Sequence, residues 1–345
     1  MLRDGSDPTW EILACSQCGA PLSPEPEGAK CTKCQTRFGH TPHGGLDLRL
    51  RATKKFPFEF ELGSPPPQDF PFVPLPRNPR PEVEFPAGKV PWHLTPQLLS
   101  HFPRARSATS FALDLGCGSG LHRFVCEQAG YRWVGLDYTA DRAPILGDGH
   151  ALPFANESFE FVLSIAVLEH IQYPFVVGRE VLRVLKPGGL YIGTVAFLEP
   201  FHGNSYYHHT HLGTYNTLRS AGFGVEYVGP NAAWSGLKAQ ASMGGLFPRM
   251  PEALGQAVVW PIEMLHRTWW KMGRLASRRP NASEQMRLVT NTGAFEFIAR
   301  KPREDGAGPR EDGAAAKARE DAAGAPSPAA GAPSPGAGAP SPGPQ

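Results

Sequence analysis

The chain has 345 residues, of which 41% are hydrophobic, and its formal net charge at pH 7 is +2. This balance excludes a strongly basic nucleic-acid-binding protein and an acidic disordered protein, and it leaves enough apolar residues for one large core. No run of eighteen apolar residues occurs, so the sequence predicts no membrane-spanning helix.

Two Cys-x-x-Cys pairs lie near the start of the chain, and twelve residues separate them: Cys15, Cys18, Cys31 and Cys34. Pairs at this separation can place four thiolates around one tetrahedral ion, which leaves no position for water and predicts a structural zinc site. Disulfides are the alternative, but closely spaced pairs without a recognisable signal peptide favour a reducing, cytoplasmic location. We expect a zinc-ribbon module over residues 1–55 that needs its metal to fold, because so short a segment buries little core.

Residues 56–91 are rich in proline and connect this module to the rest of the chain. Apolar side chains are interleaved with the prolines, among them Phe70, Phe72, Val73 and Leu75. The pattern fits an extended arm that packs on the following domain, and it fits a solvated spacer equally well.

A glycine-rich loop follows the apolar stretch Phe111 to Leu115, with glycines at Gly116, Gly118 and Gly120. Glycine allows positive φ angles and lets a ligand approach the backbone closely, so a strand that turns into a helix here predicts a site for a small, partly anionic molecule. The nicotinamide fingerprint G-x-G-x-x-G does not fit, because Leu121 stands at its third glycine position.

Further strands and acids follow this loop in order. The stretch 131–137 predicts a second strand that ends in Asp137, where a carboxylate can accept hydrogen bonds from both hydroxyls of a ribose. Next come a loop with Asp148 and Gly149, a strand over 157–164, the segment Leu168-Glu-His-Ile, a helix over 179–185, a Lys-Pro-Gly-Gly turn at 186–189 and a strand over 190–195.

This ordered set of motifs, from about residue 92 to 228 with a last strand at 293–300, resembles the class I S-adenosylmethionine-dependent methyltransferases of the type 11-like group. The resemblance implies an α/β, Rossmann-like domain with a seven-stranded, mostly parallel sheet over residues 92–300. It also implies S-adenosyl-L-methionine as cofactor, with Asp114 and the glycine loop around the methionine part, Asp137 at the ribose and Asp148 at the adenine. The cofactor-binding residues are therefore expected to be Asp114, Gly116, Cys117, Gly118, Gly120, Asp137, Tyr138, Asp148 and Gly149. Cys117 is expected to be a small filler between glycines rather than a nucleophile, and Cys126 a core residue.

The cysteine-rich start resembles the small zinc ribbons of the Trm112-like type, which occur beside methyltransferase domains, including some that act on ribosomal RNA. This resemblance is the only feature that favours an rRNA or tRNA base as methyl acceptor. The module itself is not strongly basic, since residues 2–55 carry eight Lys and Arg against six Asp and Glu.

Methyl transfer to a hydroxyl needs a base, and histidines gather where the acceptor should lie. His170 follows the fourth strand and is our candidate catalytic residue; His202, His208, His209 and His211 follow the fifth. The segment around His170 resembles that of the ubiquinone O-methyltransferases, where acids and a histidine can hold a metal. Ala166 stands where that pattern has its first acid, so we expect no metal there.

An insertion at about 231–292 separates the last two strands and contains a helical stripe over 252–276 at steps of three and four residues. Pro261 is expected to kink this helix or to begin a second one. No acid occurs between Met264 and Ser283, while Arg267, Lys271 and Arg274 lie close to Trp269 and Trp270. Such a helix can lie on an anionic membrane, peripheral to its inner face, or form a lid over the substrate.

From residue 301 the chain becomes repetitive, and residues 301–345 are expected to form a disordered tail. The sequence as a whole predicts a cytoplasmic methyltransferase that acts on a small-molecule, glycan or lipid-linked hydroxyl. An RNA base methyltransferase and a non-catalytic, cofactor-binding scaffold are the alternatives, and the oligomeric state is not predicted.

Overall fold

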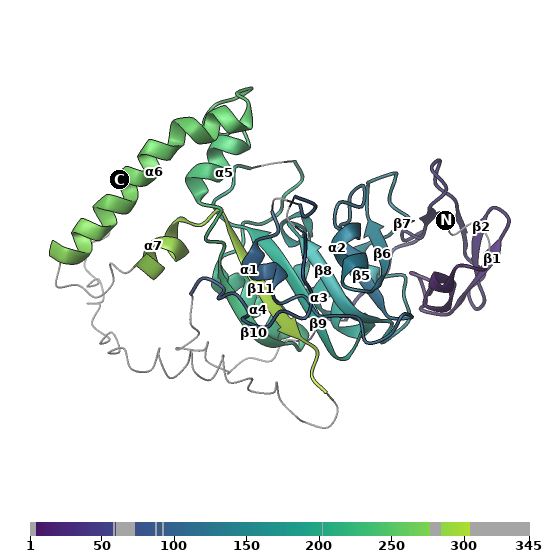
Figure 1. Cartoon of the computed structure of the whole chain (residues 1–345). Helices are drawn as coiled ribbons and strands as arrows, with labels where there is room; N and C mark the ends of the chain where they lie inside the picture. The colour runs from purple at the N-terminus through teal and green to yellow at the C-terminus, as the bar shows by residue number, and fades with distance from the viewer. Residues whose placement is uncertain are drawn as a thin grey trace, which may run out of the picture.

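The computed structural model describes residues 5–57, 59, 73–86, 88–91, 93–201, 203–276 and 284–303. Within them the chain forms a three-stranded antiparallel sheet near the N-terminus and an eight-stranded, mostly parallel sheet (Figure 1). The strand order of the large sheet is β10-β11-β9-β8-β5-β6-β7-β4. This is the α/β, Rossmann-like architecture that the sequence predicts, with β11 antiparallel to both of its neighbours.

The strands of the large sheet are β4 (Leu46–Asp47), β5 (Phe111–Leu115), β6 (Arg132–Asp137), β7 (Ile145–Leu146), β8 (Phe159–Ile165), β9 (Leu185–Ala196), β10 (Gly224–Pro230) and β11 (Ala294–Arg300). The small sheet contains β1 (Leu22–Glu25), β2 (Gly28–Cys31) and β3 (Arg37–Gly39). The helices are α1 (Pro96–Leu99), α2 (Arg123–Gln128), α3 (Pro174–Val184), α4 (His211–Ala221), α5 (Gly236–Ser242), α6 (Glu252–Ala276) and α7 (Glu284–Asn291). Three short 3-10 turns complete the set: η1 (Pro8–Glu11), η2 (Gly149–Ala151) and η3 (Leu168–His170).

The central strands are apolar on both faces, because helices cover both sides of the sheet. All five residues of β5 are buried, and neighbours along the strand enter different cores: Leu113 packs with α3 and α4, and Ala112 packs with α1 and α2. This division follows from the alternation of side chains along a strand. It leaves the carboxyl ends of β5, β6 and β8 free to carry loops.

β9 begins earlier than the sequence predicts. The Lys-Pro-Gly-Gly segment at 186–189, expected to be a turn before the strand, is already part of β9. Gly188 has a φ angle of +76°, and the register between β9 and β8 shifts next to this segment. The expected turn is therefore an irregularity inside a longer strand.

The N-terminal module is not a separate body. β4, which comes from this module, pairs in parallel with β7 and adds an eighth strand to a sheet for which we expected seven. Cys15, Cys31 and Phe38 belong to the same hydrophobic cluster as Leu113 and Val177. The apolar side chains of the module predicted over residues 1–55 are thus buried against the edge of the large sheet, and the two share one core.

Three helices, α5, α6 and α7, lie between β10 and β11, in the range where the insertion was predicted. Pro261 lies inside α6 and does not end it. None of the helices in the described ranges combines the length and the apolar character that crossing a bilayer requires. Several predicted features lie outside the described residues: Phe70, Phe72, His202, and the tail from residue 304 onward.

Candidate functional site

The glycine loop leaves β5 with one side packed and the other open. Gly116, Gly118 and Gly120 have φ angles of +71°, +53° and +90°. A Cβ atom on Gly116 would come within 2.4 Å of Val167 Cγ2, whereas a Cβ on Gly118 would meet no heavy atom within 4 Å. The loop therefore presents bare backbone to open space at Gly118, which is the arrangement that a closely bound ligand requires.

Asp114 lies beneath this loop and is fully buried. One carboxylate oxygen lies 3.3 Å from Nδ1 of His122, and the other accepts a hydrogen bond from Nε1 of Trp133 at 3.0 Å. The Trp133 ring also packs close to Gly120, where an added Cβ would lie 3.3 Å away. Asp114 thus supports the loop from below, and its side chain is buried away from the surface of the loop.

Cys117 is equally buried in the loop. Its backbone N–H donates to the carbonyl oxygen of Leu136 at 3.0 Å, and burial together with the nearby acids raises the pKa of its thiol far above the usual range. A thiol of this kind stays protonated and unreactive. Its position supports the prediction that Cys117 is a filler.

Asp137 stands at the end of β6, directly beside the glycine loop. Its Oδ2 accepts a hydrogen bond from the N–H of Gly118 at 3.0 Å, and its Oδ1 accepts from the N–H groups of Thr139 and Ala140, both at 2.9 Å. The side chain remains partly exposed. Tyr138, next along the chain, is 56% exposed, and the guanidinium of Arg49 lies over its ring at 5.8 Å.

Asp148 begins η2 on the far side of Asp137. Its Oδ1 accepts from the backbone N–H of His150 at 2.9 Å and lies 2.6 Å from Nδ1 of the same residue. Burial raises the pKa of Asp148, but the bonds from His150 outweigh it and the net effect is a lowered pKa. Both bonds fall on Oδ1, so a charged carboxylate retains Oδ2 for a ligand. Gly149 follows it and is buried against α3.

The turn η3, at the carboxyl end of β8, places Glu169 inside the protein and His170 at its partly exposed end. Glu169 is fully buried, and neither carboxylate oxygen finds a hydrogen-bond partner in the described residues. Burial raises the pKa of Glu169 to about 8. Its carbonyl oxygen accepts from the N–H groups of Tyr206 and Tyr207 at 2.6 Å and 3.2 Å, and so ties η3 to the segment after β9.

A cavity of about 380 Å³ lies between the segment that follows β9 and the helices of the insertion. Phe197, Leu198, Leu237 and Leu246 form apolar walls, while Glu199, His208, Glu263, His266, Arg287 and Asn291 contribute polar groups. Glu263 and Arg287 are buried. A mostly apolar hollow with a few ionisable groups is the usual form of a small-molecule site.

Comparison with known proteins decides the family. Residues 113–193 match the family described as Methyltransferase domain. An uncharacterized methyltransferase of Mycobacterium tuberculosis is 31% identical over 179 residues, which cover 46% of this chain and 67% of the relative. The chain belongs to this methyltransferase family. A second relative, the uncharacterized methyltransferase ML2584 of Mycobacterium leprae, is 38% identical over 106 residues, which cover 27% of this chain but only 39% of the relative.

Among solved structures, the chain resembles a chain of the complex between the Haloferax volcanii Trm112 methyltransferase activator and a methyltransferase. The identity is 19%, the TM-score is 0.42, and the match covers 61% of this chain and 90% of that one. At this TM-score the likeness says nothing about partners or substrate.

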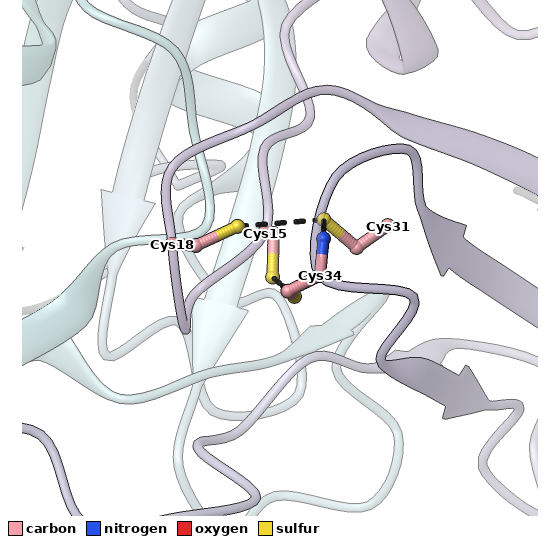
Figure 2. A group of neighbouring side chains, drawn as sticks. All are labelled: Cys15, Cys18, Cys31 and Cys34. Atoms are coloured by element: carbon pink, nitrogen blue, oxygen red, sulfur yellow. Dashed lines mark hydrogen bonds between the residues drawn. The ribbon is translucent and has the colours of Figure 1, made fainter.

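The four N-terminal cysteines of the chain meet at one point, as Figure 2 shows. Their sulfur atoms all lie within 4.8 Å of one another; Cys15 and Cys34 are 3.7 Å apart, and Cys18 and Cys31 are 3.4 Å apart. The backbone N–H groups of Lys33 and Cys34 point at Sγ of Cys31 at 3.4 Å. All four are free thiols rather than disulfides. Zn–S bonds of about 2.3 Å in a tetrahedron imply S–S separations of about 3.8 Å, so this geometry is compatible with zinc.

Sequence reasoning missed several residues of the candidate site. Trp133 was visible only as an apolar strand residue, and Arg49 lay in a module that we treated as separate. Glu199 and the cavity residues of the insertion carry no motif. Their only signal was the length of the insertion and its position between the last two strands, beside the strand end where acceptors gather.

Proposed function

We propose that the protein transfers a methyl group from S-adenosylmethionine to a hydroxyl group of a small or lipid-linked molecule, glycans included. The cavity beside the cofactor edge is the observation that carries this proposal. Its segment Phe197–Glu199 directly follows β9, which neighbours β8 at the same sheet edge as the glycine loop. Ligands of open α/β sheets bind at this carboxyl edge.

Different residues of the chain would bind different parts of the cofactor. The open backbone at Gly118 would contact the methionine part, Asp137 would accept from the ribose hydroxyls, and Oδ2 of Asp148 would accept from the adenine amino group. When bound, the cofactor supplies a methyl group that is already activated as a sulfonium. The protein then has to align the acceptor and exclude water, and alignment alone can supply about 7 kcal/mol of the barrier.

A hydroxyl acceptor must also lose its proton. His208 lines the cavity, whereas His170 lies at the end of η3 and is not among the lining residues. We propose His208 as the proton acceptor and keep His170 as the alternative from sequence. Replacing the true base with alanine should lower kcat by about 100-fold or more with a smaller change in KM.

Two features favour a small acceptor over an RNA base. The cavity is mostly apolar and has a volume of about 380 Å³, which suits a small molecule better than a polyanionic backbone. The N-terminal module is nearly balanced in charge, and its four cysteines are occupied in one cluster that we infer to be a structural zinc centre. We expect the module to stabilise the fold rather than to bind RNA.

The test is transfer of isotope-labelled methyl groups to three fractions of a cell extract: RNA, polar small molecules and lipids. The Asp137→Ala variant serves as the inactive control, and Asp141→Ala as its matched control, because Asp141 lies at the surface beside His43. We expect label in the small-molecule or lipid fraction only. Label confined to RNA would establish the alternative acceptor, and cofactor binding without label in any fraction would indicate a scaffold.

A further inference from the structure

Helix α6 carries an apolar stripe that no other part of the described chain covers. Six large apolar side chains recur at steps of three and four residues, which places them on one side of the helix. Their exposed fractions are 43–68%: Leu254, Val258, Ile262, Leu265, Trp269 and Met272. Exposed apolar side chains are common singly, but a continuous row along a helix indicates a surface that contacts something else.

A different side of α6 packs against the protein. Val259 and Glu263 are buried, and an added Cβ on Gly255 would lie 2.9 Å from the carbonyl oxygen of Ala241 in α5. Trp270 is directed away from the stripe and donates its Nε1–H to His266 at 2.8 Å. The fold therefore fixes the rotation of the helix, and the stripe is left at the surface. Figure 1 shows α6 running away from the large sheet, so that its far end stands clear of it.

The charged residues in the second half of the helix are all positive. Between Met264 and Ala276 it has no Asp or Glu, but it has Arg267, Lys271 and Arg274. Arg267 is two residues beyond Leu265, and Lys271 is two residues beyond Trp269, a spacing of a little over half a turn. Arg267 and Lys271 thus lie on the side of the helix opposite the stripe, where Trp260 is also exposed.

We propose that the apolar stripe of α6 docks on the surface of an anionic lipid bilayer. An apolar face with tryptophan and leucine, backed by a polar face of lysine and arginine, is the pattern of helices that lie in the membrane interface. The 25 residues of α6 span about 37 Å, which is long enough to lie along a membrane surface. The docking is a property of α6 and does not depend on methyl transfer.

A second copy of the chain is the competing occupant, and α6 is poorly suited to it. Paired helices set their register with opposite charges beside the apolar seam, and the second half of α6 offers only positive ones. Trp269 is bulky for such a seam but suits the boundary between lipid and water. An anionic bilayer, in contrast, has the charge sign that complements Arg267 and Lys271.

The helix provides a matched pair of variants. Trp260 and Trp269 are both largely exposed, at 60% and 68%. They are nine positions apart along the helix, which is about two and a half turns. Trp260 therefore lies on the opposite side of α6 from Trp269. Each is replaced with serine, and circular dichroism checks that both variants keep the helix content of the wild type.

The experiment is co-sedimentation of the full chain with vesicles of phosphatidylcholine alone and of phosphatidylcholine mixed with phosphatidylglycerol. We expect the wild type to bind the acidic vesicles at low salt and to be released as salt screens the attraction. Trp269→Ser should weaken this binding about tenfold or more, and Trp260→Ser should leave it nearly unchanged. Lys271→Gln should weaken it several-fold on acidic vesicles only.

Three outcomes would overturn the proposal. The first is failure to bind acidic vesicles, and the second is equal loss for the two tryptophan variants. The third is a dimer in analytical ultracentrifugation that Trp269→Ser dissociates and Trp260→Ser does not, because a second copy would then be the occupant. Methyl transfer is not measured in any of these arms, so its absence would not affect the result.

Discussion

The three aspartates around the glycine loop differ in their hydrogen bonds and in their exposure. Both oxygens of Asp114 are taken by His122 and Trp133 inside the protein. Asp148 contacts His150 through Oδ1 alone. Asp137 holds the N–H of Gly118 and remains partly exposed, so it both shapes the loop and faces the ligand side.

Replacing Asp137 with alanine should therefore weaken cofactor binding in two ways, by removing the acceptor for the ribose and by releasing Gly118. We expect a loss of roughly 2 to 4 kcal/mol in binding free energy, the sum of charge-assisted bonds and of polar groups left unpaired. Titration calorimetry with S-adenosylhomocysteine measures it, with Asp141→Ala as the control. Equal affinity of wild type and Asp137→Ala would remove Asp137 from the site.

Glu169 is a buried carboxyl whose pKa is raised by burial from 4.5 to about 8. The unfolded chain loses this proton above about pH 4.5, whereas the folded chain keeps it until about pH 8. The contribution of Glu169 to stability is therefore full at low pH and is lost as the pH rises through this window. Glu169→Gln has no such dependence, so its melting temperature relative to wild type should be higher at pH 8 than at pH 5, by about 2 °C or more.

Scanning calorimetry at the two pH values tests this, and the surface variant Glu157→Gln should show the same offset at both. If Glu169→Gln and wild type differ by a constant amount, the carboxyl ionises normally in the folded protein.

At the scale of elements, β4 connects the N-terminal module to the cofactor edge. Asp47 in β4 pairs with Leu146 in β7 and holds the Arg49 guanidinium through two hydrogen bonds of 2.9 Å and 2.8 Å. These bonds lower the pKa of Asp47 below its usual range. Arg49 in turn lies over the ring of Tyr138, next to Asp137.

Arg49→Ala should lower the affinity for S-adenosylhomocysteine several-fold, because Tyr138 loses the cation that holds it and the turn after Asp137 loosens. Arg51→Ala is the control: Arg51 also contacts Asp47, but its guanidinium lies over Phe38 and not over Tyr138. Titration calorimetry measures the affinity of both variants and of the wild type for S-adenosylhomocysteine. The same affinity for all three proteins would show that the module only covers the edge of the sheet.

The cysteine centre should act on the stability of the whole sheet, because Cys15 and Cys31 lie in the core shared with β5 and α3. We expect about one zinc per chain and a Cys31→Ser variant that unfolds in one transition at a lower temperature than wild type. Calorimetry with elemental analysis tests it, and Lys33→Ala, between two ligands, is the control. A separate early transition, with the main one unchanged, would mean that the ribbon unfolds alone.

At the scale of the molecule, the N-terminal module shares a hydrophobic core with the large sheet, and helix α6 projects away from that sheet. Removal of residues 1–57 takes away β4 and exposes the apolar surface that Leu13, Phe38 and Leu46 cover. An unpaired sheet edge with apolar surface favours aggregation. We therefore expect the shortened chain to aggregate or to melt well below the full chain in light scattering and calorimetry, whereas removal of residues 304–345 should change neither.

The sequence by itself determined the features that local chemistry dictates. Glycine spacing and a following strand that ends in Asp137 predicted the loop and its neighbour, since only glycine adopts these φ angles readily. The cysteine spacing predicted the cluster of sulfurs, and the period of apolar residues predicted α6. Each of these signals lies within a short stretch of chain.

Only the tertiary structure decided how distant stretches meet. It joined β4 to β7, placed Trp133 under Gly120, tied η3 to Tyr206 and formed the cavity between the β9 segment and the insertion. It also showed that the stripe of α6 faces outward, although the same period would equally serve a buried helix. The physical reason is that periodicity fixes which side chains share a face, whereas the packing of other elements fixes whether that face is covered.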